Sequence, residues 1–408
     1  MQTALADFIR DTESGQEANA ILRTCVHCGM CNATCPTYQL LGDELDGPRG
    51  RIYLIKQMLE GADVTRSTLT HLDRCLTCRN CETTCPSGVR YGQLLEIGRE
   101  LAEQKISRPA PDRLARWVLR NIIPYPARFM LLLRLGQLFH PLMPLWLKRS
   151  VPPRRVADPW PTTAHSRKML VLQGCVQPAI APNINAVTAR VLDRLGISLM
   201  AAAGAGCCGA ASHHTSGMED GLDFARRNID AWWPLIKSGA EAIVMTASGC
   251  GVHVKEYGHL LKDDRVYSAK ARKVSELTKD ISEILSQEDL SKLSSDAKPQ
   301  MKVAFHSPCS LQHGQKLNGV VEKILRGAGL ILVAVPDAHL CCGSAGTYSI
   351  LQKRLSQSLL TNKVTSLESG GPDVIATANI GCLAHIQSGT TLPVRHWIEI
   401  LDKLAVPR

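Results

Sequence analysis

Apolar side chains recur at helical spacing through the first quarter of the chain. They lie three and four positions apart in residues 1–24, 52–59 and 94–101, as in amphipathic helices. Gly61 ends the second of these stretches. The pattern predicts an N-terminal region built from helices.

The second half of the chain alternates two patterns. Helical stretches there separate short apolar runs of strand length, at 168–175, 197–202, 242–250, 302–309, 331–335 and 374–382. Strands that alternate with helices favour βαβ units with parallel strands. We therefore expect an α+β multidomain protein, with a helical N-terminal part and a parallel α/β C-terminal part.

Cysteines show that the α/β part is duplicated. A cysteine ends the first strand of each copy, Cys-Cys-Gly follows the second strand, and a last cysteine follows the third. Cys175 and Cys207 are separated by the same interval as Cys309 and Cys341. Even the histidines three residues beyond the last cysteines match, His253 and His385. Such self-similarity predicts two copies of one module, named here the first and second CCG modules.

Carboxyl ends of parallel strands share one edge of a sheet, so four thiols of each module should converge there. The two sets are Cys175, Cys207, Cys208 and Cys250, and Cys309, Cys341, Cys342 and Cys382. We favour a third and a fourth iron–sulfur cluster at these sets. Redox-active thiols near an electron acceptor, and small side chains buried in a core, stay open as alternatives.

The N-terminal region carries the run C-x2-C-x2-C-x3-C-P twice. In proteins with two [4Fe–4S] clusters, three cysteines of such a run hold one cluster and the fourth holds the other. This predicts Cys25, Cys28, Cys31 and Cys85 for one cluster, and Cys75, Cys78, Cys81 and Cys35 for the other. A pair of four-cysteine zinc sites is the disfavoured alternative.

The chain contains 16 cysteines and no visible export signal, since Met1 to Ala20 is polar and acidic. We therefore expect a cytoplasmic location and no disulfides. The formal charge is +10, but two clusters would lower it to about +6 and four to about +2. Aromatic residues make up only 4%. Both figures argue against nucleic-acid binding.

Residues 108–167 are rich in proline and contain the apolar stretch 129–147, which Arg134, His140, Pro141 and Pro144 interrupt. These interruptions argue against a transmembrane helix. We expect a helix packed between domains, with a membrane surface or a subunit interface as the alternative. The predicted domains are 1–107 (α-helical ferredoxin), 108–167 (connector), 168–257 (first module), 258–300 (helical linker) and 301–408 (second module).

Catalytic motifs for substrate chemistry are absent from the sequence. Gly204 to Gly209 formally matches G-x-G-x-x-G, but the second module lacks the pattern, so dinucleotide binding is not expected. No P-loop, nucleophile elbow or HExxH occurs. No catalytic residue is predicted. Arg49 and Arg51 either offset cluster charge or contact a partner, or they are solvated loop arginines.

The double cysteine run, with Gly47–Arg51 between its halves, resembles the iron–sulfur subunits of flavin-linked 2-hydroxyacid and glycerol-3-phosphate dehydrogenases. The CCG modules resemble the cysteine-rich domain of heterodisulfide reductase and lactate-utilisation proteins. The combination is most similar to the family of glycolate oxidase iron–sulfur subunits, on the stretches 40–51, 228–233 and 396–400.

This resemblance implies an electron-transfer subunit. In the family, FAD-containing partner subunits oxidise glycolate to glyoxylate, and the iron–sulfur subunit passes electrons to a quinone or similar membrane acceptor. It also implies a peripheral position on the inner face of the cytoplasmic membrane. The equivalent subunit for lactate or glycerol 3-phosphate, and a structural zinc protein that organises an interaction surface, are the alternatives.

The sequence departs from the heterodisulfide reductase pattern at one place. That version ends each module with C-x-x-C, whereas the first position of this pair is Ala247 in one module and Asn379 in the other. A five-cysteine cluster is therefore not expected; a four-ligand cubane, or no cluster, is favoured instead.

Overall fold

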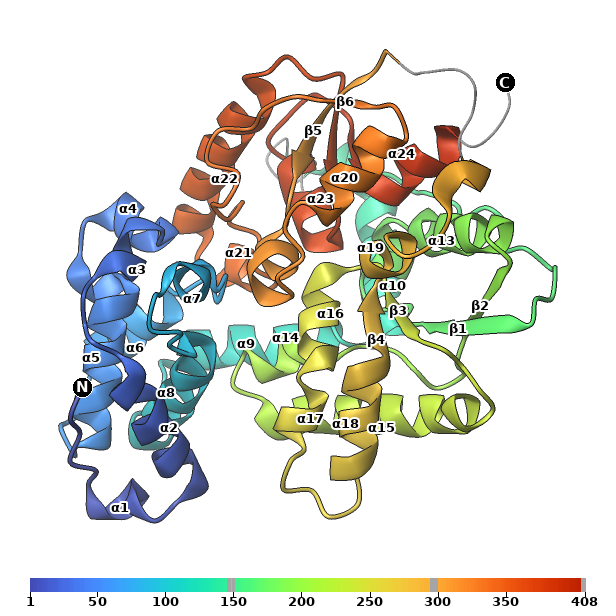
Figure 1. Ribbon diagram of the computed structural model, residues 1–408. Coiled ribbons are helices and arrows are strands. Elements are labelled where there is room, and N and C mark those ends of the chain that lie inside the picture. The colour runs from blue at the N-terminus through green and yellow to red at the C-terminus, as the bar shows by residue number, and fades with distance from the viewer. Residues whose placement is uncertain (145–147, 149–150, 294–299, 405–408) are drawn as a thin grey trace. The chain divides into compact units, whose positions relative to one another are not determined.

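A computed structural model describes residues 1–144, 148, 151–293 and 300–404 (Figure 1). The chain forms two compact units. The helical unit contains Met1–Ala115 and His339–Lys363, and the α/β unit contains Arg116–Ala338 and Val364–Arg408. The segment 339–363, which carries the Cys-Cys-Gly turn of the second module, thus belongs to the helical unit.

The helical unit is built from short helices, as the apolar spacing predicts. They are α1 Asp7–Arg10, α2 Glu13–Thr24, α3 Met30–Ala33, α4 Pro36–Leu41, η1 Glu44–Asp46, α5 Pro48–Leu59, α6 Arg66–Asp73, α7 Asn80–Thr84, α8 Tyr91–Lys105 and α21 Tyr348–Leu351. Helix α9, Ala110–Ile122, begins in this unit, and its part from Arg116 onward belongs to the α/β unit. The core of the unit comes from α2, α5, α6 and α8, whose Leu22, Ile55, Leu72 and Leu94 have no exposed surface.

Local signals in the sequence start these helices. Thr12 caps α2 by accepting a hydrogen bond from the backbone of Gly15, and Pro48 occupies the first turn of α5. Thr65 and Thr68 form a reciprocal capping box at the start of α6. Both loops that carry the cysteine runs therefore lie between well-defined helix ends.

The first sheet of the α/β unit is parallel, with the strand order β2-β1-β3-β4. Its strands are β1 Arg167–Val171, β2 Ile197–Ala201, β3 Ile243–Met245 and β4 Thr278–Asp280. The accompanying helices are α12 Gln177–Ile180, α13 Asn183–Arg194, α14 Ala210–His213, α15 Met218–Lys237, α16 Ser248–Lys255, α17 Tyr257–Leu260, α18 Ser268–Leu277, α19 Ile281–Leu285 and η3 Leu290–Leu293.

The second sheet repeats the same order as β6-β5-β7-β8 and is also parallel. Its strands are β5 Lys302–His306, β6 Ile331–Leu332, β7 Val374–Thr377 and β8 Val394–His396. The accompanying helices are η4 Ser310–Gly314, α20 Val320–Gly327, α23 Ile380–Gln387 and α24 Trp397–Leu404; of α22, Lys353–Glu368, only the part from Val364 onward belongs to this unit. The predicted fold class, a helical domain followed by duplicated parallel α/β modules, is confirmed.

Each sheet has a fourth strand that the sequence pattern does not indicate. β4 lies within 258–300, which was predicted as a helical linker, yet Val244 of β3 pairs with Lys279 of β4. β8 extends the second sheet in the same way, where Ala376 pairs with Arg395. Three residues are too few for a periodic pattern, so both strands escape detection.

The two sheets are joined within the α/β unit by polar contacts near their strand ends. The Ser248 amide donates to the Ala378 carbonyl at 3.1 Å, and the His396 ring lies 2.9 Å from the Thr246 carbonyl. Burial lowers the pKa of His396 to about 4, so this ring is neutral. On the far side, Arg190 and Arg194 both donate to Asp402, at 2.8 and 3.0 Å.

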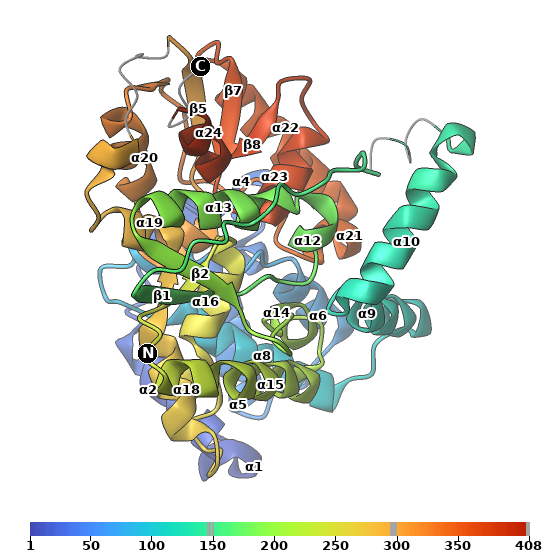
Figure 2. The ribbon, with the colours of Figure 1, turned by 90° about the vertical axis from the view of Figure 1, so that its right-hand side faces the viewer.

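The apolar stretch 129–147 forms α10, Pro126–Leu138, and the short η2, His140–Leu142; residues 145–147 lie outside the described part (Figure 2). Helix α10 has no buried residue, and Leu131 and Leu138 are 62% and 71% exposed. The expectation that this helix packs between domains stays a prediction. Among the described residues, none of the helices is long and apolar enough to cross a bilayer.

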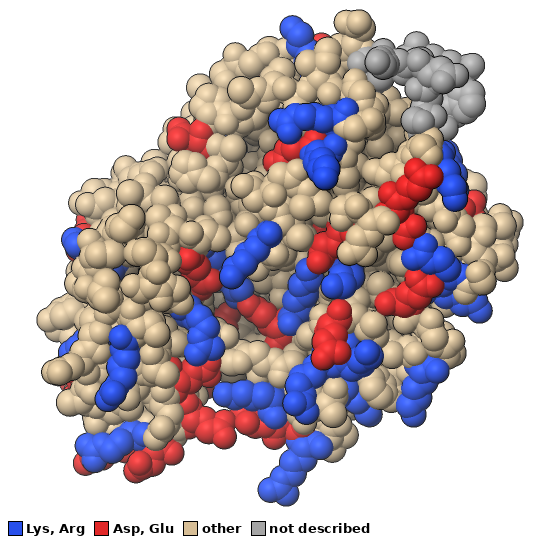
Figure 3. All heavy atoms as spheres, viewed as in Figure 1, with Lys and Arg blue, Asp and Glu red and all other residues tan. Residues whose placement is uncertain are grey.

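Charged side chains are distributed over the surface in both signs. On the face shown in Figure 3, Lys and Arg side chains are interspersed with Asp and Glu. The net charge of +10 is therefore not concentrated in one patch on that face.

The exposure of α10 predicts that substitutions on this helix have little effect on the stability of the protein. Leu131→Gln and Leu138→Gln should each change the free energy of unfolding by less than about 0.5 kcal/mol, because neither side chain is buried. The control is Leu94→Gln, which places an amide in the helical core and should cost about 3–5 kcal/mol. Urea unfolding followed by circular dichroism measures both. A large loss for the α10 variants would show that the helix is buried.

Candidate metal centres

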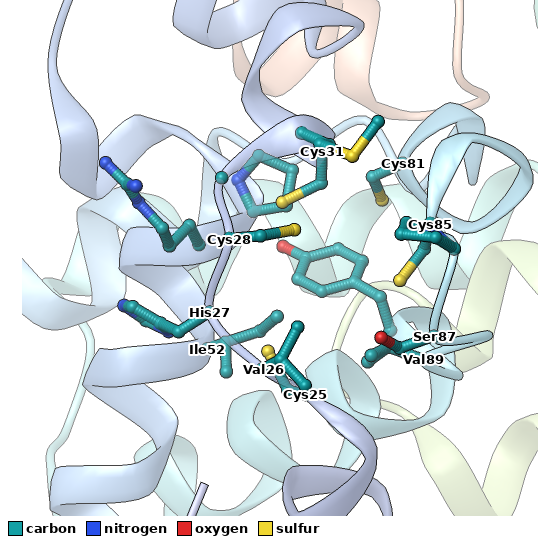
Figure 4. A pocket seen from close by; sticks show the side chains of 16 residues that line it. Cys25, Val26, His27, Cys28, Cys31, Ile52, Cys81, Cys85, Ser87 and Val89 are labelled. Carbon is teal, nitrogen blue, oxygen red and sulfur yellow. The ribbon is translucent and has the colours of Figure 1, made fainter.

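Both cysteine runs contribute to one pocket of the helical unit (Figure 4). Cys25, Cys28 and Cys31 of the first run and Cys81 and Cys85 of the second line it. The first loop wraps around the pocket because His27 and Gly29 adopt left-handed backbone angles, with φ of 59° and 85°. Thr77 and Arg79 adopt the same conformation in the second loop, with φ of 53° and 60°.

The thiols in this pocket act on one another electrostatically. Burial, followed by the charges of Cys25, Cys85 and Cys28, raises the pKa of Cys31 to about 11. Three of these four cysteines come from the first run and one from the second. Ionised thiolates this close repel each other, so a bound cation is needed to hold them all as thiolates.

A second group of thiols lies around Cys81. Burial raises the pKa of Cys81 well above its ordinary value, and the charges of Cys78, Cys75 and Cys35 add to the effect. Cys35, the last cysteine of the first run, is thereby grouped with three cysteines of the second. The structure thus brings together both predicted sets, although Cys81 also lines the pocket of the first.

Arg51 lies beside the second set, in a fully buried position. Its Nε donates to the His71 carbonyl at 2.7 Å, and its guanidinium donates to Thr37 Oγ1 at 3.2 Å. Thr37 Oγ1 is in turn 3.3 Å from Cys35 Sγ. Burial raises the pKa of Cys35, and the positive charge of Arg51 opposes that increase. Arg51 is therefore a buried counter-charge for the second set.

Asp46 completes this buried network. It has no exposed side-chain surface, accepts a hydrogen bond from Arg74 at 2.7 Å, and lies 3.0 Å from His71 and 3.5 Å from Arg51. Arg49, two residues from Arg51, instead forms a 2.6 Å ion pair with Glu44 at a site where both side chains are over a third exposed. The two arginines of one motif therefore have different roles, which the sequence could not separate.

The first CCG module also gathers its four thiols. Cys175 follows β1, Cys207 and Cys208 follow β2, and Cys250 lies in the first turn of α16 after β3. The thiols of Cys175 and Cys208 donate to the Cys207 sulfur and lower the pKa of Cys207 well below its ordinary value. Cys208 also interacts with Cys250, and its own pKa is raised. This convergence matches the sequence prediction for the strand edge.

Neighbouring groups fix the Cys-Cys-Gly turn of this module. Tyr257 Oη donates to the Cys208 carbonyl at 2.6 Å, and Asn228 Nδ2 donates to the Cys207 carbonyl at 2.8 Å. Gly209 has a φ of 96°, and a Cβ there would lie 2.5 Å from the Gly221 carbonyl oxygen. Only glycine fits this turn. Asn228 and Tyr257 had no sequence signal for this role, since neither lies near a cysteine in the chain.

The cysteines of the second module are divided between the two units. In the α/β unit, Cys309 follows β5, and Cys382 lies in α23 and accepts a 3.7 Å hydrogen bond from Asn379 Nδ2. In the helical unit, the Cys341 sulfur accepts from the Gly343 amide at 3.4 Å, as Cys207 does from Gly209. Asn379, which stands where the related pattern has a cysteine, thus contacts the thiol of Cys382.

The matched histidines do not behave as evident ligands. His253 is buried against Tyr257, with ring centroids 5.8 Å apart, and against His213 at 5.4 Å. His385 is half-buried on α23. Tyr91, which no sequence signal singled out, is buried and donates to Cys75 Sγ at 3.6 Å.

Models of known families match the same regions. A "4Fe-4S dicluster domain" matches residues 21–89, and a "Cysteine-rich domain" matches residues 169–255 and again 303–387. The fold and the gathered thiols therefore define an iron–sulfur protein with a dicluster ferredoxin domain and a duplicated cysteine-rich domain.

Relatives identify the particular family. The chain is 58% identical to the glycolate oxidase iron-sulfur subunit of Escherichia coli (strain K12), over 99% of both chains. It is 29% identical to a probable glycolate oxidase iron-sulfur subunit of Bacillus subtilis, over 90% of this chain and 89% of that one. Lactate utilization protein A of Bacillus velezensis is 30% identical over 58% of this chain and 99% of its own. The chain belongs to the family of glycolate oxidase iron–sulfur subunits, as the motifs predicted.

The two arginines offer a matched test of the buried network. Arg51→Met leaves Asp46 with less buried positive charge and should lower the free energy of unfolding by about 3–5 kcal/mol. Arg49→Met, which removes a surface ion pair, should cost less than about 1 kcal/mol. Chemical unfolding of anaerobically purified protein measures both. Equal losses of unfolding free energy in the two variants would show that Arg51 contributes no more to the buried network than the surface residue Arg49 contributes to its ion pair.

Proposed function

We propose that this chain transfers electrons within a glycolate-oxidising complex through two [4Fe–4S] clusters in its N-terminal domain. Cys25, Cys28, Cys31 and Cys85 would hold one cluster, and Cys75, Cys78, Cys81 and Cys35 the other. The observation that carries the proposal is the exchange of the fourth cysteine between the two runs. Cys31 is affected by the charge of Cys85, and Cys81 by that of Cys35.

This exchange favours clusters over zinc. A structural zinc site closes around four ligands and gives two independent four-cysteine runs no reason to exchange their last cysteines. In two-cluster ferredoxins the exchange is the rule, and each run ends in Pro, here Pro36 and Pro86. Bound clusters would supply one-electron transfer. The chain would supply the thiolates, the Arg51 counter-charge and the Tyr91 hydroxyl that donates to Cys75.

The CCG modules would hold one or two further clusters. The first would use Cys175, Cys207, Cys208 and Cys250, whose thiols already contact one another. The second would use Cys309, Cys341, Cys342 and Cys382. Each module offers four thiols, because Ala247 and Asn379 stand where the heterodisulfide reductase pattern has a fifth cysteine. Four thiolate ligands suit a cubane cluster. Redox-active thiols without iron remain the competing use of these residues.

Substrate oxidation would take place on FAD-containing partner subunits. The relative with 58% identity is named as a subunit of glycolate oxidase, and this chain has no substrate or flavin motif of its own. The first cluster set is the natural contact for a redox partner. Cys28 is exposed there, and Val26 and Met30 beside it are 70% and 53% exposed. Electrons would continue to a quinone or other membrane acceptor.

Glycolate is favoured over lactate by relative similarity. The glycolate oxidase subunit matches the full chain at 58%, whereas the lactate utilization proteins match little more than half of it at 30% or less. Co-purifying the chain with its flavoprotein partners and supplying glycolate or lactate decides the substrate. Reduction of the iron–sulfur signals by glycolate alone supports the proposal, and reduction by lactate alone overturns it.

Iron analysis tests the cluster assignments. Cys208→Ser and Cys342→Ser should each lower the iron content of anaerobically purified protein by up to one cluster, or about four iron atoms. Ala210→Ser, which places a hydroxyl next to the first Cys-Cys-Gly turn, is the control and should retain all iron. If wild type and both cysteine variants hold only the iron of two clusters, the modules bind none. Zinc without acid-labile sulfide would exclude clusters altogether.

A peripheral position on the cytoplasmic face of the membrane would use the exposed leucines of α10. The double variant Leu131→Gln/Leu138→Gln should reduce co-flotation of the complex with lipid vesicles, because apolar surface drives insertion at the interface. Tyr53→Phe, a change on α5, is the control. Unchanged flotation of the leucine variant would point to a protein partner for α10 instead.

A further inference from the structure

The segment His339–Lys363 packs on the second cysteine loop of the N-terminal domain. Asn80 Nδ2 donates to the His339 carbonyl at 3.2 Å and to the Thr34 carbonyl at 3.0 Å. Tyr348 Oη donates to the Arg74 carbonyl at 3.1 Å. Asn80 and Arg74 flank Cys75, Cys78 and the residues between them. The segment is therefore anchored at both ends of the loop that supplies the second cluster set.

Tyr348 lies close to cysteines of both parts. Its side chain is buried, and its pKa is raised by burial and then by the charges of Cys75 and Cys341. Cys75 belongs to the second cluster set, and Cys341 begins the Cys-Cys-Gly turn of the second module. Through its hydrogen bond to the Arg74 carbonyl, Tyr348 therefore lies beside the loop that begins at Cys75, in the same segment as Cys341. Figure 1 shows α21, which begins at Tyr348, beside α7, which begins at Asn80.

The first module has different residues at the positions of His339 and Tyr348. By the repeat interval, His214 takes the place of Tyr348 and Ala205 that of His339. His214 contacts the rings of His213 and His253 within its own module. The two modules therefore differ in sequence at the position of Tyr348.

The two cluster sets also differ in how exposed their cysteines are. The first set borders a pocket and has one exposed cysteine, Cys28. The second includes the buried Cys35, Cys75 and Cys81, and the segment 339–363 contacts its loop. An external redox partner can reach the first set, whereas the second faces a part of the same chain.

We propose that the Cys341–Cys342 turn is the direct electron partner of the second cluster set, so that electrons pass between the N-terminal domain and the second CCG module. Tyr348 and Asn80 are the positioning residues of this contact. The step moves one electron and no atoms: the site of Cys75 is oxidised by one electron as the iron–sulfur site of the second module is reduced. The inference rests on the proposed function, since it requires a redox centre in that module.

Electron paramagnetic resonance of the reduced, full-length protein tests this route. A paramagnetic centre at Cys341 and Cys342 should broaden the signal of the second N-terminal cluster. Cys341→Ser should remove that broadening, and the matched Cys207→Ser should leave it. An effect of Cys207→Ser alone, or no effect of either variant, overturns the inference. The iron content of the wild-type protein separates this outcome from failure of the proposed function. If the wild type holds no iron in its CCG modules, the proposed clusters there are absent and the inference falls with them.

A second readout does not depend on iron in the modules. Tyr348→Phe removes one hydrogen bond that holds the segment on the loop, so a chelator should remove iron from the second N-terminal cluster about fivefold faster. The first cluster should lose iron at the wild-type rate. Tyr53→Phe, the same chemical change elsewhere in the helical unit, is the control. Equal rates for Tyr348→Phe and wild type would show that the segment does not cover the cluster.

Discussion

Repulsion between buried thiolates is the constraint on which this structure depends. In the helical unit and in the first CCG module, cysteines from distant parts of the chain are placed close enough to raise or lower each other's pKa values. Without iron, such groups are stable only when most of them keep their protons. The helices around them are therefore arranged to support a charge that a bound cluster would spread over iron and sulfide.

Buried charge near the second set shows how the protein compensates. Arg51 and Asp46 are both fully buried, and a charge pair in that position is costly unless every partner is present. Here Thr37, His71 and Arg74 supply those partners. The network places a cation near Cys35 while it ties η1 to α5 and α6. Stability of the domain and the environment of the second set thus depend on the same side chains.

Sequence spacing predicted the parts of the molecule that ligand chemistry determines. Fixed intervals between cysteines revealed the two modules and predicted both N-terminal sets, because thiols that share a metal must return to one place. The intervals contain no information on residues that act through packing. Arg49 and Arg51 look alike in the chain, yet only Arg51 is buried. β4 and β8 are too short to show a period, and α10 is as apolar as a packed helix although it is exposed. Tertiary contacts decide each of these cases.

Duplication provides two similar cysteine sites, and the contacts around them then make the sites unequal. A Cys-Cys-Gly turn needs glycine at Gly209 and Gly343 for the same steric reason, so the local geometry is shared. Beyond the turn, the first module holds its cysteine carbonyls with its own Asn228 and Tyr257. The second places Tyr348 on the N-terminal domain. Because electron transfer depends on which centres are neighbours, the proposed order of electron carriers rests on these side chains outside the ligand sets as much as on the ligands themselves.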